Sequence, residues 1–278
     1  MPSRTARAAA VHRAVHQILE GGRIFRDPLA VPILGEPAEV LVREAEERRA
    51  SRTMRIFIAA RTRFAEDALA AAVERGVSQL VVLGAGLDTF AYRNPFGGRL
   101  HVFEVDHPAT QFYKRGRLAE AGITVPDSLT FAPVDFERQR LAKGLDEAGF
   151  DTAQQTFFTW LGVVPYLTQE AIWSTLAWIA GVAGGAHVVF DYGDPPETLG
   201  AHARELHDRR AARVQALGES WVSYFRPEEL RTRQEALGFL HVEDLGPAGI
   251  ARRYFPQRAG AFPETGGHVL YASTRPIE

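Results

Sequence analysis

Apolar residues in the first quarter of the chain recur at helical spacing. Ala8, Val11, Val15 and Leu19 fall three or four positions apart, and a glycine pair ends that segment. The same spacing predicts a longer helix from position 53 to a glycine at position 76. The N-terminal region is therefore predicted to consist of helices, with a short turn or helix at 29–34 and breaks at Gly21-Gly22 and at Gly35 to Pro37.

Short apolar runs suited to buried parallel strands follow, and helical segments separate them. The predicted strands cover 79–83, 100–105, 129–133, 155–160, 186–191, 239–243 and 268–274. The predicted helices cover 108–121, 137–148, 168–181, 197–217 and 227–238, and Thr168 is expected to cap the third of them. The Gly- and Pro-rich stretch 246–267 is predicted to be irregular, so the last strand needs no helical crossover and is expected to be antiparallel.

This alternation predicts an α/β fold, a doubly wound and mostly parallel seven-stranded sheet of the Rossmann-like kind. Residues 1–60 are expected to form an N-terminal helical cap or lid. Residues 61–278 are expected to form the domain that carries the chemistry.

The composition narrows the classes of function. The net charge of -2 gives no electrostatic support for binding nucleic acid, and no apolar run approaches the roughly twenty residues of a membrane span. The chain has no cysteine, which excludes disulfides and thiolate metal sites and suits the cytoplasm. The Arg- and Ala-rich residues 1–14 lack the apolar segment of a secretory signal and are interpreted as the start of the first helix.

The first predicted strand leads directly into Gly84-Ala85-Gly86, and the second ends on Asp106, twenty positions after Gly86 (106 minus 86). This layout is typical of a nucleotide site, where glycines allow close approach of the backbone and the acid binds ribose hydroxyls. A dinucleotide site would have a third glycine at position 89, where this chain has Thr89. The sequence therefore favours S-adenosylmethionine (SAM), with S-adenosylhomocysteine (SAH) as the product.

Polar and aromatic residues also follow the other predicted strands, at the sheet edge where ligands bind. Asp135 and Phe136 are candidates for the adenine, although Asp135 would equally suit a helix cap. His107, Tyr166 and Asp191 are the candidate catalytic groups.

Two arginines lie in the long helix that precedes the first strand. Arg61 or Arg63 could bind the carboxylate of SAM, although such residues commonly lie on a solvated face. No metal site is predicted, because the nine histidines show no ligand spacing. Six aromatic residues could line an apolar acceptor pocket or equally form core: Trp160, Trp221, Tyr224, Phe225, Tyr254 and Phe255.

Several segments in this order resemble one known family. They are Ser3-Arg4-Thr5-Ala6, Arg26-Asp27-Pro28, Ala60-Arg61-Thr62-Arg63-Phe64, Leu83-Gly84-Ala85-Gly86-Leu87-Asp88-Thr89 with Arg93, Phe103-Glu104-Val105-Asp106-His107-Pro108, Val134-Asp135-Phe136, Trp160-Leu161-Gly162-Val163-Val164-Pro165-Tyr166-Leu167 and Phe190-Asp191-Tyr192-Gly193-Asp194. The chain resembles the leucine carboxyl methyltransferase-like family of class I SAM-dependent methyltransferases, in its bacterial polyketide-type carboxyl O-methyltransferase branch.

The resemblance implies that Gly84 binds SAM, that Asp106 binds its ribose, and that Asp135 and Phe136 lie at the adenine. It also implies that Arg61 binds the SAM carboxylate. Leu161 stands where many members carry a glutamate in the cofactor or substrate site, which favours the small-molecule branch over the branch that modifies phosphatases. The expected reaction is O-methylation of a small molecule of secondary metabolism.

The acceptor is left open by the sequence. A carboxylate is favoured because it is ionised at neutral pH and needs no base, whereas a phenol or alcohol would need one. A SAM-binding protein without catalysis and an NAD(P)-dependent oxidoreductase are the alternatives of other classes. Association into a homo-oligomer is also left open.

Overall fold

The computed structural model describes residues 4–47, 52–135, 139–257 and 265–276. The chain divides into two compact units. The first contains residues 1–73 and 77–151, and the second contains residues 74–76 and 152–278. The predicted boundary between a cap (1–60) and a catalytic domain (61–278) stays a prediction.

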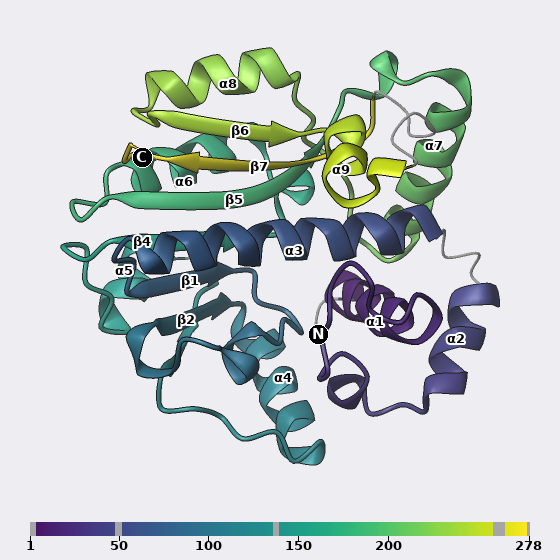
Figure 1. The fold of residues 1–278 in the computed structure, drawn as a ribbon, viewed down its shortest axis with the longest axis horizontal. Coiled ribbons are helices and arrows are strands. Elements are labelled where there is room, and N and C mark those ends of the chain that lie inside the picture. Colours follow the sequence, from purple (N-terminus) through teal and green to yellow (C-terminus); the bar gives the residue numbers. More distant parts are fainter. Residues whose placement is uncertain (1–3, 48–51, 136–138, 258–264, 277–278) are drawn as a thin grey trace. The chain divides into compact units, whose positions relative to one another are not determined.

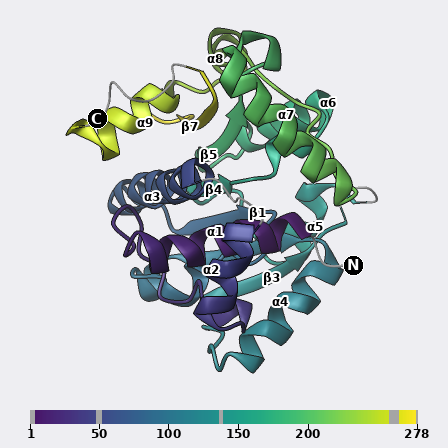
Figure 2. The same ribbon diagram turned by 90° about the vertical axis from the view of Figure 1, so that its right-hand side faces the viewer.

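The N-terminal region of the first unit is helical, as predicted. Its elements are α1 (Arg4–Leu19), the 3-10 turn η1 (Pro32–Leu34), α2 (Ala38–Glu47) and α3 (Arg52–Glu74). Both views show α2 beside α1 (Figures 1 and 2). The apolar positions that predict α3, among them Ile56, Phe64 and Leu69, are buried.

The first helix packs its apolar face on the rest of the first unit. Ala10, Ala14 and Val15 of α1 are fully buried in one cluster with Leu87 and Leu118. Leu19, the last residue of the predicted apolar face, is instead 47% exposed. The N-terminal helices therefore share a core with the loop that follows the first strand.

Three parallel strands form the sheet of the first unit, β1 (Gln79–Leu83), β2 (His101–Asp106) and β3 (Leu129–Pro133). Two short 3-10 turns, η2 (Phe90–Arg93) and η3 (Gly97–Arg99), lie between β1 and β2. The connecting helices are α4 (Pro108–Glu120) and α5 (Leu141–Glu147). Every residue of β1 is buried, as expected for a central strand with an unbroken apolar run.

The second unit contains the other four strands, β4 (Thr156–Trp160), β5 (Ala186–Gly193), β6 (His241–Leu245) and β7 (Gly267–Ser273). Its helices are α6 (Gln169–Ala180), α7 (Ala201–Ala216), α8 (Pro227–Ala236) and α9 (Pro247–Tyr254), with the 3-10 turns η4 (Val164–Tyr166) and η5 (Pro196–Thr198). The last strand, β7, pairs antiparallel with both β5 and β6, which confirms the prediction. Figure 1 shows α8 lying along β6.

The seven strands follow the order β3-β2-β1-β4-β5-β7-β6. The predicted mostly parallel seven-stranded α/β fold is therefore confirmed. The predicted cap of α6 is also confirmed, because the Thr168 hydroxyl accepts a hydrogen bond from the Ala171 N–H.

The prediction of an irregular stretch over 246–267 is wrong in its first part. Pro247 begins α9 there, and Ile250 and Ala251 are buried on its inner face. Proline suits the first turn of a helix, where its missing N–H costs nothing, so it starts this element instead of preventing it.

Candidate cofactor site

The loop after β1 is a tight turn that requires glycine. Gly84 and Gly86 have φ angles of 68° and 47°, a region that other residues adopt at a cost. The Gly84 and Ala85 N–H groups donate to the Val105 carbonyl at 2.9 and 3.0 Å, which holds the loop against the end of β2. The turn therefore presents its backbone at the carboxyl end of β1, where nucleotides bind in this architecture.

The structure brings Asp106 and this loop together, as the spacing predicts. The Asp106 carboxylate accepts hydrogen bonds from the Gly86 N–H at 2.5 Å and the His107 N–H at 2.7 Å. Burial raises the pKa of Asp106, and these two N–H groups oppose the shift. A carboxylate has about four lone-pair directions, more than the two N–H groups use. Its position and its acceptor oxygens fit the ribose hydroxyls of SAM.

Glu104, two residues earlier in β2, has a structural role. Its carboxylate is buried and pairs with Lys114 of α4 at 2.7 Å, and it accepts a hydrogen bond from the Tyr92 hydroxyl at 3.2 Å. Burial raises the pKa of Glu104 to about 7, with Lys114 acting in the opposite direction. The ion pair therefore joins α4 to β2, two residues before the predicted ribose ligand Asp106.

Asp135 follows β3 but does not cap α5, because that helix begins at Leu141 after Arg140. Its backbone N–H donates to the Gln139 side chain at 3.2 Å. One carboxylate oxygen lies 4.0 Å from Nε2 of His107, so two of the predicted site residues are neighbours. Phe136, the predicted partner on the adenine ring, lies outside the described residues.

His107, a candidate catalytic group, is the cap of α4. Its Nδ1 accepts a hydrogen bond from the Ala109 N–H at 3.1 Å, and its side chain is 52% exposed. Since the lone pair on Nδ1 is used by the cap, only Nε2 is left to exchange a proton with a ligand.

The structure separates the two candidate arginines of α3. Arg61 is 8% exposed, with its guanidinium 5.8 Å from the centre of the Phe57 ring. Arg63 is exposed and forms an ion pair with Asp67 one turn later at 2.7 Å. A buried guanidinium suits a bidentate contact to a carboxylate, so the geometry favours Arg61 over Arg63.

The other candidates lie in the second unit. Asp191 of β5 is 4% exposed and accepts a hydrogen bond from the Gly162 N–H at 2.5 Å, so it holds the loop that follows β4. Leu161 in that loop and Tyr166 in η4 are half-buried. Asp191 therefore joins the ends of two neighbouring parallel strands.

A histidine and a tyrosine that the sequence did not pair meet near this loop. Nε2 of His207 in α7 lies 3.0 Å from the Tyr224 hydroxyl, and its Nδ1 lies 3.0 Å from the Asp208 carboxylate. The hydrogen bond with His207 lowers the pKa of Asp208, whereas burial raises the pKa of Tyr224. The contact joins a helix to a coil segment, so no local pattern could reveal it.

Tyr224 is anchored to the loops after β4 and β5. The Val222 N–H donates to the Pro165 carbonyl at 2.8 Å, and the Phe225 N–H donates to the Gly193 carbonyl at 3.1 Å. Of the aromatic residues considered for an acceptor pocket, Trp160 and Phe225 are buried as core, while Trp221 and Tyr224 lie around His207. These two are the better candidates for an acceptor site.

Among the described residues, no three His, Cys, Asp or Glu side chains are grouped so that they could hold a metal ion. No helix in the same residues is both long and apolar enough to cross a membrane.

An alanine at position 86 is expected to weaken cofactor binding roughly tenfold, equivalent to about 1.4 kcal/mol. The φ of 47° is strained for alanine, and its Cβ would lie 2.9 Å from the Cβ of Ala6 in α1. Titration calorimetry with SAH would measure the change. Gly98→Ala is the control, because a Cβ there meets no atom within 4 Å. Equal affinity of both variants for SAH would contradict the prediction.

The strand order, the glycine turn after β1 and the carboxylate that ends β2 define an α/β protein of the nucleotide-cofactor-binding class. Two solved structures share the fold over most of the chain. A protein from Thermobifida fusca YX, titled "putative methyltransferase", aligns with a TM-score of 0.59 and 16% identity, covering 95% of this chain and 94% of that one. A duf574 family protein from Streptomyces avermitilis aligns with a TM-score of 0.54 and 15% identity, covering 95% and 97%.

Residues 6–180 match the family model described as leucine carboxyl methyltransferase, and the chain belongs to that family. A Bacillus subtilis relative named "Putative S-adenosyl-L-methionine-dependent methyltransferase YktD" is 39% identical over 205 residues. A Mycobacterium marinum relative named "Putative S-adenosyl-L-methionine-dependent methyltransferase" is 32% identical over 216 residues, which are 74% of this chain and 71% of the relative.

The alignment with the Bacillus subtilis relative covers 72% of this chain and 66% of that protein. A relative from Saccharopolyspora erythraea is 35% identical over 62% of this chain and 61% of its own length. The chain thus spans somewhat less than two thirds of these two relatives. The cofactor of the family is SAM, which confirms the prediction drawn from the missing third glycine.

Proposed function

We propose that the protein is a SAM-dependent O-methyltransferase that methylates the carboxylate of a small molecule of secondary metabolism. The observation that carries the proposal is the family match over residues 6–180, within which Asp106 and the Gly84–Gly86 turn are joined by a hydrogen bond. In this proposal Gly84, Gly86 and Asp106 bind the nucleoside of SAM.

The remaining predicted residues complete the cofactor site of the proposal. Asp135 and Phe136 bind the adenine, and the Arg61 guanidinium binds the carboxylate of SAM. SAM supplies an electrophilic methyl group. The chain's own residues orient the acceptor oxygen in line with that group and exclude water, which lowers the barrier without covalent catalysis.

A carboxylate acceptor needs no proton removed, because its ordinary pKa is about 4. One of its oxygens attacks the methyl carbon, the carbon–sulfur bond breaks, and the electron pair stays on sulfur. The products are a methyl ester and SAH. No general base is required of this chain in that reaction.

A hydroxyl acceptor is the second candidate, and the contact between His207 and Tyr224 favours it. The ionised Asp208 only accepts hydrogen bonds, so Nδ1 of His207 carries a proton. With Nδ1 as the donor to Asp208, Nε2 is the nitrogen that accepts from the Tyr224 hydroxyl. The Tyr224 oxygen keeps its lone pairs for an O–H group of the acceptor, and its own proton can pass to His207.

The test is methyl transfer from labelled SAM to a panel of small carboxylates, phenols and alcohols, with formation of SAH as a second readout. The proposal expects methylated products that mild base hydrolyses, as it does esters. Ether products stable to base would replace it with the hydroxyl candidate. SAH binding without any turnover would indicate a binding protein without catalysis. Binding of NAD(P) in place of SAH would indicate an oxidoreductase.

Tyr224→Phe separates the two acceptors. With a carboxylate acceptor the variant is expected to retain kcat within about twofold, because no base takes part. With a hydroxyl acceptor we expect kcat to fall on the order of tenfold or more, the lower range for loss of a general base. Steady-state kinetics on the accepted substrate decides between them, with Tyr113→Phe on α4 as the matched control.

A further inference from the structure

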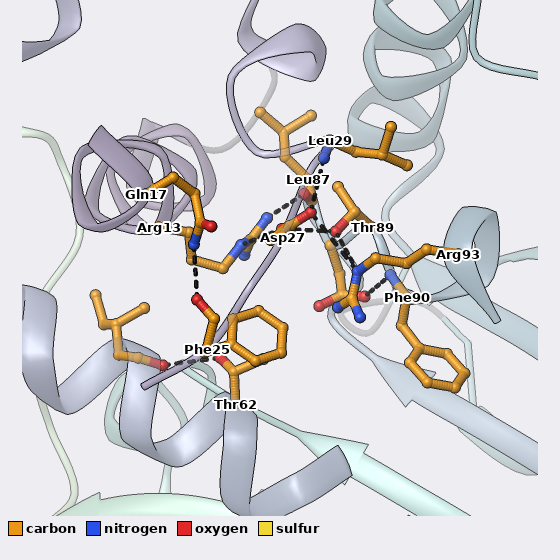
Figure 3. A network of polar contacts seen from close by, with 12 residues as sticks. Arg13, Gln17, Phe25, Asp27, Leu29, Thr62, Leu87, Thr89, Phe90 and Arg93 are labelled. Carbon is orange, nitrogen blue, oxygen red and sulfur yellow. Dashed lines mark hydrogen bonds and ion pairs between the residues drawn. The ribbon is translucent and has the colours of Figure 1, made fainter. Parts of the chain in front are cut away.

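Asp27, from the loop between α1 and η1, is a buried carboxylate at the centre of a polar network in the first unit (Figure 3). Its side chain is 0% exposed. One oxygen accepts a hydrogen bond from the Thr89 hydroxyl at 2.7 Å, and the other accepts from the Leu29 N–H at 3.0 Å. Thr89 lies three residues after Gly86, so Asp27 contacts the end of the glycine loop.

Two arginines surround this carboxylate. Nε of Arg13 lies 3.4 Å from one oxygen, and Nε of Arg93 lies 3.6 Å from the other. Arg13 also donates to the carbonyl of Leu87 at 2.5 Å, immediately after Gly86 (Figure 3). Asp27 therefore helps to fix the guanidinium that holds the loop carbonyl.

Arg93 has further partners besides Asp27. Its guanidinium forms a bidentate pair with Glu66 of α3 and lies 4.9 Å from the centre of the Phe25 ring. Its Nε also donates to the Thr89 hydroxyl at 3.2 Å. The Thr89 hydroxyl is thus held between Asp27 and Arg93 and has one defined orientation.

These contacts act on the residues that directly follow Gly86, whose N–H donates to Asp106. Asp106 holds the Gly86 N–H, Arg13 holds the Leu87 carbonyl, and Asp27 holds the Thr89 side chain. Burying an unpaired carboxylate would destabilise the fold, so the carboxylate needs partners. Stability alone, however, does not require those partners to belong to the cofactor loop. Asp27 instead acts on the cofactor loop at two residues after Gly86, at Thr89 directly and at Leu87 through Arg13.

We propose that Asp27 is a positioning residue for SAM, which sets the cofactor loop through Arg13 and Thr89. The proposal rests on the assignment of the Gly84–Gly86 turn and Asp106 to the cofactor under the proposed function. Asp27 does not touch the cofactor. It holds the loop in the geometry that binds, so the cofactor does not have to order the loop itself.

Asp27→Asn is the first test, measured as the Kd for SAH by titration calorimetry on the full chain. Asparagine has the same shape but turns an NH₂ group toward donors and removes the charge that faces Arg13. We expect the Kd to rise roughly tenfold, the lower end of what loss of a supporting residue costs at metal sites. An unchanged Kd overturns the proposal.

Glu20→Gln is the matched control for buried charge. The Glu20 side chain is 12% exposed and pairs with Arg55 at 2.9 Å, away from the loop. Both variants are expected to melt at lower temperature, but only Asp27→Asn should bind SAH more weakly. An equal loss of affinity in Glu20→Gln would show that general destabilisation explains the effect and would overturn the proposal.

Thr89 gives a second test that leaves the buried charges in place. Thr89→Val keeps the shape and removes the hydroxyl, whereas Thr89→Ser keeps the hydroxyl. Weaker SAH binding in the valine variant with recovery in the serine variant supports the proposal. Equal Kd values of the valine and serine variants for SAH overturn the proposal. This test also holds if Asp27→Asn does not fold.

Asp106→Ala distinguishes failure of this proposal from failure of the function on which it rests. If Asp106→Ala loses SAH binding and Asp27→Asn does not, only the positioning role is wrong. If Asp106→Ala binds SAH as the unmodified chain does, the cofactor site itself is misassigned and the positioning role falls with it.

Discussion

Replacing Asp106 with alanine is expected to reduce SAH binding by about 100-fold or more while the chain stays folded. Asp106 ends β2 and is proposed to accept hydrogen bonds from the ribose. A hydrogen bond to a charged group contributes about 1.5 kcal/mol or more, so two of them amount to about 3 kcal/mol, or roughly 100-fold. The substitution also releases the Gly86 N–H, which Asp106 accepts at 2.5 Å.

Titration calorimetry with SAH measures this effect, and circular dichroism checks that the variant is folded. Asp146→Ala is the control, because Asp146 is exposed on α5 of the same unit. We expect the control to bind SAH within about twofold of the unmodified chain. Similar affinities of the two variants for SAH would show that Asp106 does not bind the nucleoside.

The second large effect concerns the stability of the second unit above neutral pH. His268 of β7 lies between two carboxylates, with Nδ1 3.0 Å from Asp244 and Nε2 3.2 Å from Asp194. Burial by itself lowers the pKa of the imidazole, but the hydrogen bonds and charges of Asp194 and Asp244 outweigh it and raise the pKa of His268 to about 9. The ring also stacks on Tyr192, with centroids 4.7 Å apart.

The folded chain therefore binds this proton more tightly than the unfolded chain, whose histidine titrates near 6.5. The stabilisation is complete below about pH 6.5 and is lost as the pH rises to about 9, since the unfolded state loses its proton first. The pKa of His268 thus differs by about 2.5 between the folded and the unfolded chain. This difference contributes on the order of 3 kcal/mol to the free energy of unfolding.

Thermal unfolding followed between pH 6 and pH 10 tests this prediction. The melting temperature of the unmodified chain is expected to fall over this range more steeply than that of His268→Gln. Since other groups titrate equally in both proteins, the difference between the two curves isolates His268. Parallel curves would show that the imidazole is not held in its charged form.

Much of the architecture followed from local sequence. The bounds predicted for the strands at 79–83 and 129–133 agree with β1 and β3, because each is an apolar run ended by glycine or proline. Thr168 was predictable as a cap because a hydroxyl before a helix has one dominant use. The helix α9 was missed because Pro247 and the surrounding glycines were interpreted as breaking structure, although proline also starts helices.

The candidate site was predictable only where its residues share a strand or a turn. Gly86 and Asp106 follow neighbouring strands, so their spacing was informative. By contrast, Arg13 reaches the Leu87 carbonyl across 74 positions, and Tyr224 meets His207 across 17 positions of helix and coil. Such contacts are fixed by tertiary packing, and a periodic pattern carries no information about them.

The close approach of Ala6 to Gly86 makes the volume beside the cofactor loop a joint property of two distant residues. A methyl group added at position 86 would lie 2.9 Å from the methyl group of Ala6. Any side chain larger than alanine at position 6 would therefore crowd the loop much as a substitution of the glycine would. The glycine loop therefore requires a small residue at two places, in the turn itself and in the helix α1 eighty positions earlier in the chain (86 minus 6).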